Sequence, residues 1–537
     1  MDRYTTFILK HRRLIILAFV IGAVVCAGLS TMVGVDYEFA DYLPDDAPST
    51  KALDTMEDEY DQAVPNMRVL IYDVTIPEAL EYKEKISQVE GVQEVSWLDD
   101  SIDIYSPLEE ADPDTVNEWY KGSDALFSVT TSGDEQEKAA AVHGIRKVIG
   151  DKNAMSGSAV TDVLSPVLSS QEIQKIMMFV IPIVFVVLFF ATTSWFEPVL
   201  FMITIGIAIL LNMGTNLMFG TISFVTNAAG SVLQLAVSMD YSIFLLHRFA
   251  ENRGEGRTVE QAMIAAVRQS TSSILSSGLT TVTGFAALIL MRFKIGPDMG
   301  WVMAKAVVFS LFAVLCLLPA LAISTYKLID KTRHRPFFPK FNRFSGAVMK
   351  IRIPVLLLAA VIAVPCYMAQ KSNDFIYGAS EVYNTNATQM GRDLLAVDKE
   401  YGASNPIVVM VPKGDMSREN ALNDALKKED SVTSVISYAN TVGASVPDGY
   451  VPSESLEQLE SEHYSRFVVT LDTEEADPEW AEKLDRIHAL CEKYYGDKAL
   501  IAGDLASTED LKTTITQDNT RVNAMAIGFV FLILLFN

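Results

Sequence analysis

The residues Ser231–Arg253, SVLQLAVSMDYSIFLLHRFAENR, place a carboxylate inside an apolar stretch long enough to form a membrane-spanning helix. The carboxylate belongs to Asp240, and Tyr241 follows it directly. A charged side chain near the centre of a bilayer costs roughly 3 kcal/mol or more, so such residues are rare and often mark ion or proton pathways. We therefore interpret Asp240 as the proton-responsive centre of a transporter. This interpretation requires the rest of the chain to be a membrane protein.

The composition fits a membrane protein that also has large polar domains. Half of the 537 residues are hydrophobic, and most of the 67 acidic residues lie in two polar blocks, 34–171 and 369–520. Outside the flanks of the apolar stretches, the sequence has no basic patch of the kind that binds nucleic acid. The four cysteines form no CxxC pattern, and no GxxxxGK[ST] phosphate-binding loop occurs. The sequence therefore predicts no metal site and no cofactor, and it does not favour an enzyme.

Apolar stretches of about 20 residues, the length that a helix needs to cross about 30 Å of hydrocarbon, recur along the chain. They predict a first span within 1–33, spans two to six within 172–325, a seventh at 352–368 and a partial eighth at 521–537. A basic linker, 326–351, separates the sixth and seventh spans. Because basic connections stay on the cytoplasmic side, we expect the N-terminus and this linker to be cytoplasmic. Both polar blocks then lie outside a bacterial cytoplasmic membrane.

Each polar block predicts the order strand, helix, strand, strand, helix, strand, which is the split βαβ order of ferredoxin-like domains. In the first block the elements run from a strand at Met67–Val74 to a strand at Ala154–Ser158. In the second block they run from Ile407–Val411 to Ala499–Ala502. The sequence thus predicts a tandem repeat of one span, one outer α+β domain and further spans, as in parallel-repeat transporters.

Polar residues gather on one face of the predicted fourth span and recur on the fifth. Gln234 and Ser238 share a helical face with Tyr241, because they are spaced four and three residues apart. On the fifth span, small hydroxylated residues that allow close helix contacts recur at similar spacing; they are Ser273, Ser277 and Thr280. We interpret these serines, the threonine and Gln234 as polar surroundings of the proton site. Packing alone would explain the serines and the threonine equally well.

The predicted sixth span contains a second charge, Lys305. At 1.5 Å per residue, Asp240 and Lys305 each lie about 12 Å deep from opposite faces of the bilayer. That leaves roughly 6 Å between them along the normal of a hydrocarbon core of about 30 Å. We hypothesise that Lys305 belongs to the proton relay and pairs with Asp240 only when Asp240 is ionised. Two alternatives remain open. Lys305 could extend to the outer headgroups of the membrane. Asp240 could be a static carboxylate whose hydrogen bonds are satisfied within the protein.

Three short motifs along the chain are distinctive. Ser238-Met239-Asp240-Tyr241, followed by Arg248-Phe249, is similar to the fourth-span signature of the MMPL branch of the resistance-nodulation-division (RND) superfamily. Asp41-Tyr42-Leu43-Pro44 and Gly296-Pro297-Asp298-Met299-Gly300 also resemble it. The resemblance implies a polytopic α-helical membrane protein with an RND-type tandem repeat. In the family, Asp-Tyr pairs on the fourth and tenth spans form a proton relay, and Asp240 and Tyr241 match the first pair.

The resemblance implies a proton-motive-force-driven secondary active exporter of lipids or other hydrophobic compounds. Because the last apolar stretch is short and the second repeat is incomplete, we expect a fragment of a 12-span transporter. Its expected partners are protons, membrane lipid and a lipid-like substrate, and a homo-oligomer is compatible with the sequence. The alternative is a sterol-sensing-like lipid-binding or secretion-accessory membrane protein that exports no small molecule. Proton-independent lipid binding would favour this alternative.

Overall fold

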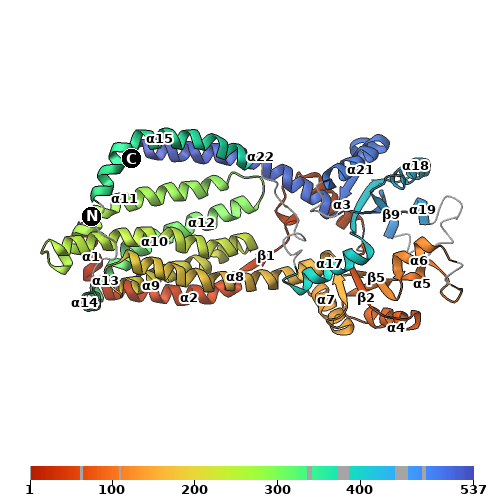
Figure 1. The fold of residues 1–537 in the computed structure, drawn as a ribbon, viewed down its shortest axis with the longest axis horizontal. Helices are drawn as coiled ribbons and strands as arrows, with labels where there is room; N and C mark the ends of the chain where they lie inside the picture. The colour runs from red at the N-terminus through yellow and green to blue at the C-terminus, as the bar shows by residue number, and fades with distance from the viewer. Residues whose placement is uncertain are drawn as a thin grey trace. The chain divides into compact units, whose positions relative to one another are not determined.

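The computed structural model describes residues 2–60, 64–107, 111–132, 134–334, 342–371, 386–441, 458–473 and 479–536. These residues form two compact units (Figure 1). The helical unit comprises Met1–Asp36, Ser170–Phe375 and Asp518–Asn537, and the sheet unit comprises Tyr37–Ser169 and Ile376–Gln517. Parts of the predicted basic linker and of the second polar block lie outside the described residues.

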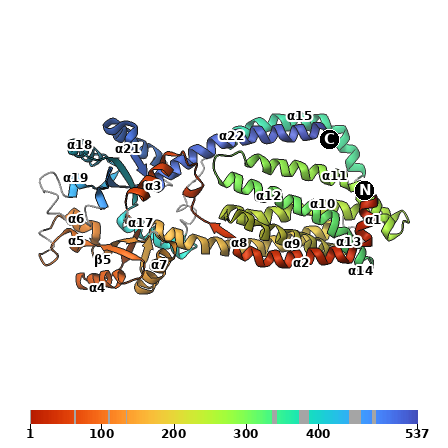
Figure 2. The same ribbon diagram turned by 180° about the vertical axis from the view of Figure 1, so that it is seen from behind.

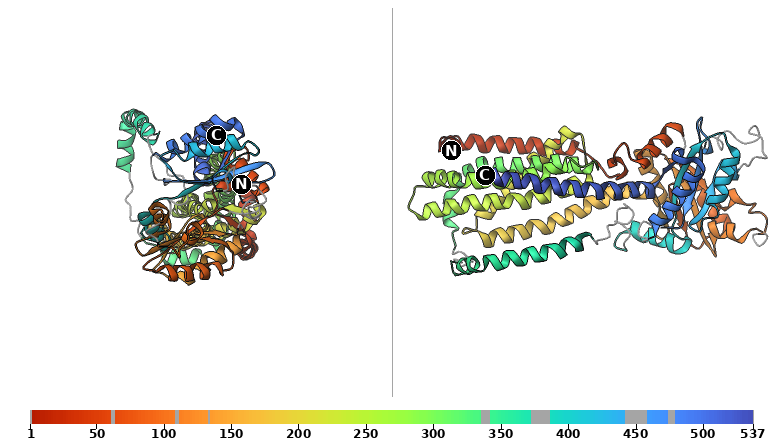
Figure 3. Two further views of the ribbon diagram at one scale, coloured as in Figure 1. Left: turned by 90° about the vertical axis from the view of Figure 1, so that its right-hand side faces the viewer. Right: turned by 90° about the horizontal axis from the view of Figure 1, so that it is seen from above.

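Seven helices among the described residues are long and apolar enough to cross a membrane. They are α2 (Arg12–Leu29), α8 (Ser158–Ala191), α9 (Glu197–Thr215), α10 (Phe224–Gly254), α12 (Ile295–Phe312) with its continuation through a π-helical turn (Ala313–Leu317) into α13 (Leu318–Ser324), α15 (Asn342–Lys371) and α22 (Asp504–Phe536). A short helix, α1 (Asp2–Lys10), precedes α2 in the chain, and another, α14 (Tyr326–Lys331), follows α13. Within the helical unit, α2, α9, α10 and α12 lie side by side (Figures 2 and 3).

Two features differ from the predicted spans. The helix that contains the predicted fifth span, α11 (Val259–Leu288), is not among the seven, because the stretch QSTSSILSSGLTTVTG lowers its mean hydropathy. It nevertheless packs against α10 and α12. In addition, α8 and α22 begin within the predicted polar blocks, because helical hydrogen bonding continues through polar residues before the apolar part starts.

The sheet unit contains two sheets with the same strand order. In the first sheet the order is β3-β5-β2-β6, in the second it is β11-β8-β10-β9, and neighbouring strands in both are antiparallel. The first part of the unit consists of β2 (Met67–Ile71), α4 (Ile76–Ser87), β3 (Val92–Ser96), α5 (Leu98–Ser101), α6 (Pro113–Trp119), β4 (Tyr120–Lys121), β5 (Asp124–Thr131), α7 (Glu135–Ile149) and β6 (Ala154–Ser156). The second consists of β8 (Asn405–Pro412), α18 (Met416–Leu426), β9 (Val432–Ile436), α19 (Tyr438–Thr441), β10 (Tyr464–Leu471), α21 (Trp480–Tyr495) and β11 (Leu500–Ala502).

Equivalent glycines make the turn from the last strand of each sheet into the following long helix. Gly157 precedes α8 with φ 117°, and Gly503 precedes α22 with φ 128°. A Cβ atom at Gly157 would lie 2.5 Å from the carbonyl oxygen of Asn66, and one at Gly503 would lie 3.0 Å from that of Pro406. Glycine is needed at both turns, since other residues rarely adopt this backbone conformation and the space is filled.

The two sheets exchange a helix. Helix α17 (Gln389–Tyr401) packs against β6 of the first sheet, whereas α3 (Pro48–Glu59) packs against β11 of the second sheet. Val397 of α17 is buried with Leu70, Leu126 and Ala154 of the first sheet. On the second sheet, a matching set of buried residues consists of Ala52, Tyr60, Val408, Met410 and Ala502. Each sheet therefore completes its packing with a segment from the other half of the sequence.

Charged and polar contacts accompany both exchanged helices. Arg68 of β2 lies 3.5 Å from Asp398 of α17 and donates to the carbonyl oxygen of Gly402 at 3.0 Å. Burial lowers the pKa of Arg68, and Asp398 opposes that shift. At the start of α3, Asp510 accepts hydrogen bonds from the backbone N–H and the hydroxyl of Ser49, at 2.7 and 2.6 Å. The exchange is thus held by directional contacts as well as by apolar burial.

The unfolding of the sheet unit is expected to depend on pH through His488 of α21. Its Nε2 lies 3.5 Å from Glu509, and a hydrogen bond to this carboxylate raises the pKa of His488, while burial opposes the shift. Asp485 and Asp510 raise it further. A raised pKa in the folded state means that the contribution to stability is present below the ordinary value of about 6.5 and is lost as pH rises through the raised value.

Replacing the histidine should remove this contribution. In H488Q, unfolding midpoints at about pH 6 and about pH 8 should differ less than in the unchanged protein, as measured by thermal unfolding of the purified chain. His143, an exposed residue of α7, supplies the matched control H143Q, in which the difference should be retained. An unchanged pH dependence in H488Q would contradict the assignment.

Candidate functional site

Helix α10 carries the predicted proton site and exposes its carboxylate. The hydroxyl of Ser223 caps the helix by accepting from the backbone N–H of Val225 at 3.1 Å. Tyr241 is 4% exposed, and its hydroxyl lies 3.3 Å from that of Thr281 on α11. Asp240 points to the opposite environment: it is exposed, and none of the described residues forms a hydrogen bond or ion pair with it. Among the described residues, Asp240 therefore has no partner that would make it a static, satisfied carboxylate.

A buried polar network joins α10 to α12 near this site. The side-chain amide of Gln234 donates to the carbonyl oxygen of Ala306 at 3.1 Å and to the hydroxyl of Ser310 at 3.2 Å. Ser238 Oγ lies 2.6 Å from Ser310 Oγ. All three polar side chains are buried, and these bonds satisfy the amide nitrogen of Gln234 and both hydroxyls, whereas Oε1 of Gln234 has no hydrogen-bond partner among the described residues. Gln234 and Ser238 thus share a polar partner, Ser310 of α12, which sequence reasoning missed.

The hydroxylated residues predicted on α11 do not join this network. Ser273 and Ser277 are exposed, and the Thr280 hydroxyl donates to the carbonyl oxygen of Ser276 within its own helix, at 2.9 Å. The contact to the relay motif is made instead by Thr281, one residue farther along, through Tyr241. Adjacent residues of a helix point in directions that differ by about 100°. A prediction from spacing alone can therefore select Thr280 in place of its neighbour Thr281.

Lys305 is held by the end of α9 and not by Asp240. Its ammonium donates to the carbonyl oxygen of Asn212 at 3.2 Å, to the hydroxyl of Thr215 at 3.0 Å and to Oδ1 of Asn216 at 2.6 Å. A cation at the C-terminal end of a helix satisfies free carbonyl groups and interacts favourably with the helix dipole. The predicted pairing between Asp240 and Lys305 is therefore absent. Equal depth along two helices does not place two side chains on facing sides.

This arrangement predicts a stability effect for Lys305 that is separate from proton handling. In K305M, the acceptors at the end of α9 lose their donor, and unfolding should become easier by about 1–3 kcal/mol. Thermal unfolding in detergent measures the change, with K327M as a control at an exposed lysine of α14. A variant of unchanged stability that nevertheless loses proton-dependent activity would instead support a relay role for Lys305.

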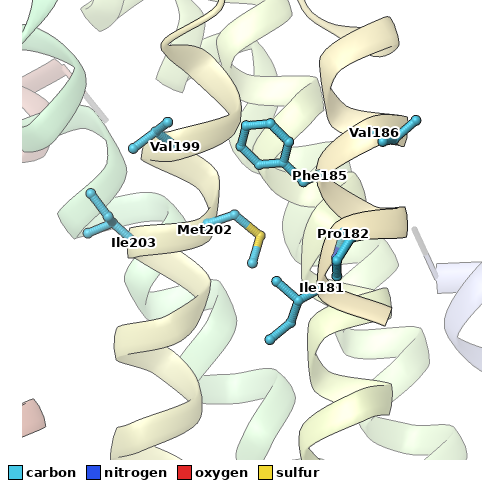
Figure 4. Close-up of a pocket in the computed structure, with 7 residues that line it drawn as sticks. All are labelled: Ile181, Pro182, Phe185, Val186, Val199, Met202 and Ile203. Atoms are coloured by element: carbon cyan, nitrogen blue, oxygen red, sulfur yellow. The ribbon is translucent and has the colours of Figure 1, made fainter. Parts of the chain in front are cut away.

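An apolar groove lies between α8 and α9. It has a volume of about 610 Å³ and is lined by Ile181, Pro182, Phe185, Val186, Val199, Met202 and Ile203. In the close-up, Phe185 and Met202 extend into the space between the two helices (Figure 4). Every lining side chain is apolar, so the groove suits a hydrocarbon chain or another hydrophobic ligand. No group of three or more metal-ligating side chains with suitable placement occurs among the described residues.

Comparison with known proteins supports the resemblance found in the motifs. The sequence model of the MMPL family matches residues 41–345. A putative membrane protein of Streptomyces coelicolor is 28% identical over 365 residues, which cover 62% of this chain and 49% of that protein. The mycolic acid-containing lipids exporter MmpL11 of Mycolicibacterium smegmatis is 26% identical over 255 residues, which cover 43% of this chain and 26% of the exporter.

Two further comparisons bear on length and fold. A putative membrane protein of Methanocaldococcus jannaschii is 33% identical over 121 residues, covering 22% of this chain and 29% of that protein. The chain thus spans between 26% and 49% of the length of these curated relatives. Among solved structures, the hedgehog release protein Disp from the water bear Hypsibius dujardini aligns with 100% of this chain and 83% of its own, with a TM-score of 0.54 and 12% identity. This likeness concerns the fold, which is that of a polytopic helical membrane protein.

Proposed function

Because the chain belongs to the MMPL family, a branch of the RND superfamily, we propose that it forms part of a proton-motive-force-driven exporter of lipids or other hydrophobic compounds. Asp240 carries the proposal, since it is an exposed carboxylate on an apolar helix with no partner among the described residues. A charge facing hydrocarbon costs roughly 3 kcal/mol or more, and protonation relieves that cost. Such a carboxylate is suited to bind a proton in one state and a polar partner in another.

In the proposed relay, Asp240 binds the proton, and the adjacent Tyr241 is the second member of the pair. Thr281 supports the orientation of Tyr241, because their hydroxyls lie 3.3 Å apart. Gln234, Ser238 and Ser310 join α10 to α12, so the two helices would shift together when Asp240 changes its protonation state. We propose that the exposed hydroxyls of Ser273 and Ser277 on α11, with Thr280, meet another polar surface in the assembled transporter.

The proposed orientation follows the distribution of basic residues. The N-terminus and the basic linker would be cytoplasmic, in a bacterial cell membrane. The two halves of the sheet unit would then be outside, as ferredoxin-like domains. The strand orders β3-β5-β2-β6 and β11-β8-β10-β9 support this domain type, since each places the first and third strands at the centre with the fourth and second at the edges.

A second candidate function is a sterol-sensing-like lipid-binding or secretion-accessory role without export of a small molecule. The groove between α8 and α9 favours it, because an apolar volume of about 610 Å³ could hold a lipid without moving it. The two functions differ in their dependence on protons.

Proteoliposomes containing a fluorescent phosphatidylethanolamine test the choice. Under an imposed pH gradient, the exporter should move this lipid, and a protonophore that collapses the gradient should stop the movement. Lipid binding that continues without gradient-driven movement would reject the exporter in favour of the second candidate.

A further inference from the structure

Helix α22 carries a buried carboxylate that the proposed relay does not use. Asp518 is 1% exposed. Its Oδ2 accepts hydrogen bonds from the backbone N–H groups of Arg292 at 2.7 Å and Phe293 at 2.8 Å. Both residues lie in the connection between α11 and α12, directly before Lys294, the N-cap of α12. The carboxylate therefore fixes the start of α12 to α22.

The chemistry of this contact argues for a positioning role. A carboxylate near the start of a helix interacts favourably with the dipole, and hydrogen bonds to an ionised acceptor are stronger than neutral ones. However, Oδ1 of Asp518 is buried without a hydrogen-bond partner among the described residues, which carries a desolvation cost. Because this desolvation cost remains, the contact adds little to the net stability of the fold. Its main effect is to fix the geometry between α22 and α12.

A second carboxylate continues the connection from α12 to α10. Asp298, in the first turn of α12, accepts from the backbone N–H of Ser223 at 2.8 Å and from the hydroxyl of Thr226 at 2.6 Å. Ser223 is the N-cap of α10, the helix that carries Asp240. Two carboxylates thus link α22, α12 and α10 through the starts of α12 and α10.

We propose that Asp518 is a positioning residue of the transport cycle, holding α12, and through Asp298 also α10, to α22. A shift of α10 that follows a change at Asp240 would then move α22 as well. Helix α22 begins at Asp504, directly after Gly503 and β11, and is continuous to Phe536. The helix that would move in response to a shift of α10 is therefore α22, which follows the last strand of the second sheet. The link between the three helices rests on the geometry alone, whereas its effect on transport rests on the proposed export function.

Hydrogen exchange of the full chain in nanodiscs tests the link. In D518A, the amides of Arg292 and Phe293, and those at the start of α10, should exchange at least about tenfold faster, which corresponds to about 1.4 kcal/mol. D518N, which keeps an acceptor oxygen without the charge, should give a smaller increase. D298N should accelerate exchange only at the start of α10. T516A is the control, because the Thr516 hydroxyl is exposed and donates only within α22. Unchanged exchange at Arg292 and Phe293, or at the start of α10, in D518A would overturn the proposal.

The transport consequence is measured as the amount of fluorescent phosphatidylethanolamine moved per proton in proteoliposomes. D518A should still take up protons, whereas the lipid moved per proton should fall at least about fivefold, the lower end of typical coupling effects. A defect in folding alone would lower both fluxes together, and that result would refute a positioning role. If the unchanged protein moves no lipid under the gradient, the export function fails, and the exchange experiment still decides whether Asp518 holds the three helices together.

Discussion

Replacing Asp240 by asparagine is expected to abolish gradient-driven lipid movement while leaving the fold intact. Asparagine has nearly the same shape as aspartate, and Asp240 is exposed with no partner among the described residues, so the substitution disturbs no packing or ion pair. What is lost is the group that can bind and release a proton. In proteoliposomes, lipid movement under a pH gradient should fall to the level of protein-free vesicles.

A matched control is available on the same helix. Glu251 is an exposed carboxylate near the end of α10, where it pairs with Arg248 at 2.8 Å. E251Q removes a carboxylate of the same charge outside the apolar part of the helix, and transport should be retained. Equal loss in E251Q and D240N would indicate a general effect of charge on α10. Normal gradient-driven movement in D240N would remove Asp240 from the relay.

A large loss of stability is expected when a charge is placed between α17 and the first sheet. Val397 is fully buried there, and V397D would bury a carboxylate among apolar side chains. An unpaired buried charge costs several kcal/mol, so α17 should detach from the sheet or the sheet unit should unfold. Limited proteolysis and hydrogen exchange of the full chain should show loss of protection in α17 and in β6.

Lys399 provides the control for this substitution. It is exposed on the same helix, so K399D introduces an aspartate in water and should leave protection of α17 nearly unchanged. If V397D and K399D gave the same protection pattern, α17 would not be an integral part of the first half of the sheet unit.

Local signals explain why much of the sheet unit could be predicted. Helix α7, at Glu135–Ile149, is the second helix of the order predicted for the first polar block. Its ends are set by neighbours: the side chain of Asp134 accepts from the N–H groups of Gln136 and Glu137, and Gly150 leaves the helix with φ 71°. Caps and glycine ends are encoded within a few residues, so they are visible in one sequence.

Contacts between distant segments explain what could not be predicted. The exchange of α3 and α17 depends on the shape of two complete sheets, and neither helix carries a local sign of its distant partner. The Asp240–Lys305 hypothesis used depth along each helix, but contact also depends on the direction in which each side chain points. Lys305 instead donates to acceptors at the end of α9. Asp518 likewise lies more than two hundred residues along the chain from its partners, Arg292 and Phe293.

Infrared difference spectroscopy of the reconstituted chain tests directly whether Asp240 takes up the proton, because it detects the protonation of a carboxyl group without any assumption about the substrate. Spectra of the unchanged protein and of D240N are compared as pH is lowered. The unchanged protein should show a protonated-carboxyl band that is absent in D240N and retained in the exposed-site control E251Q. Identical bands in the unchanged protein and D240N would show that Asp240 does not take up the proton and has no place in the relay.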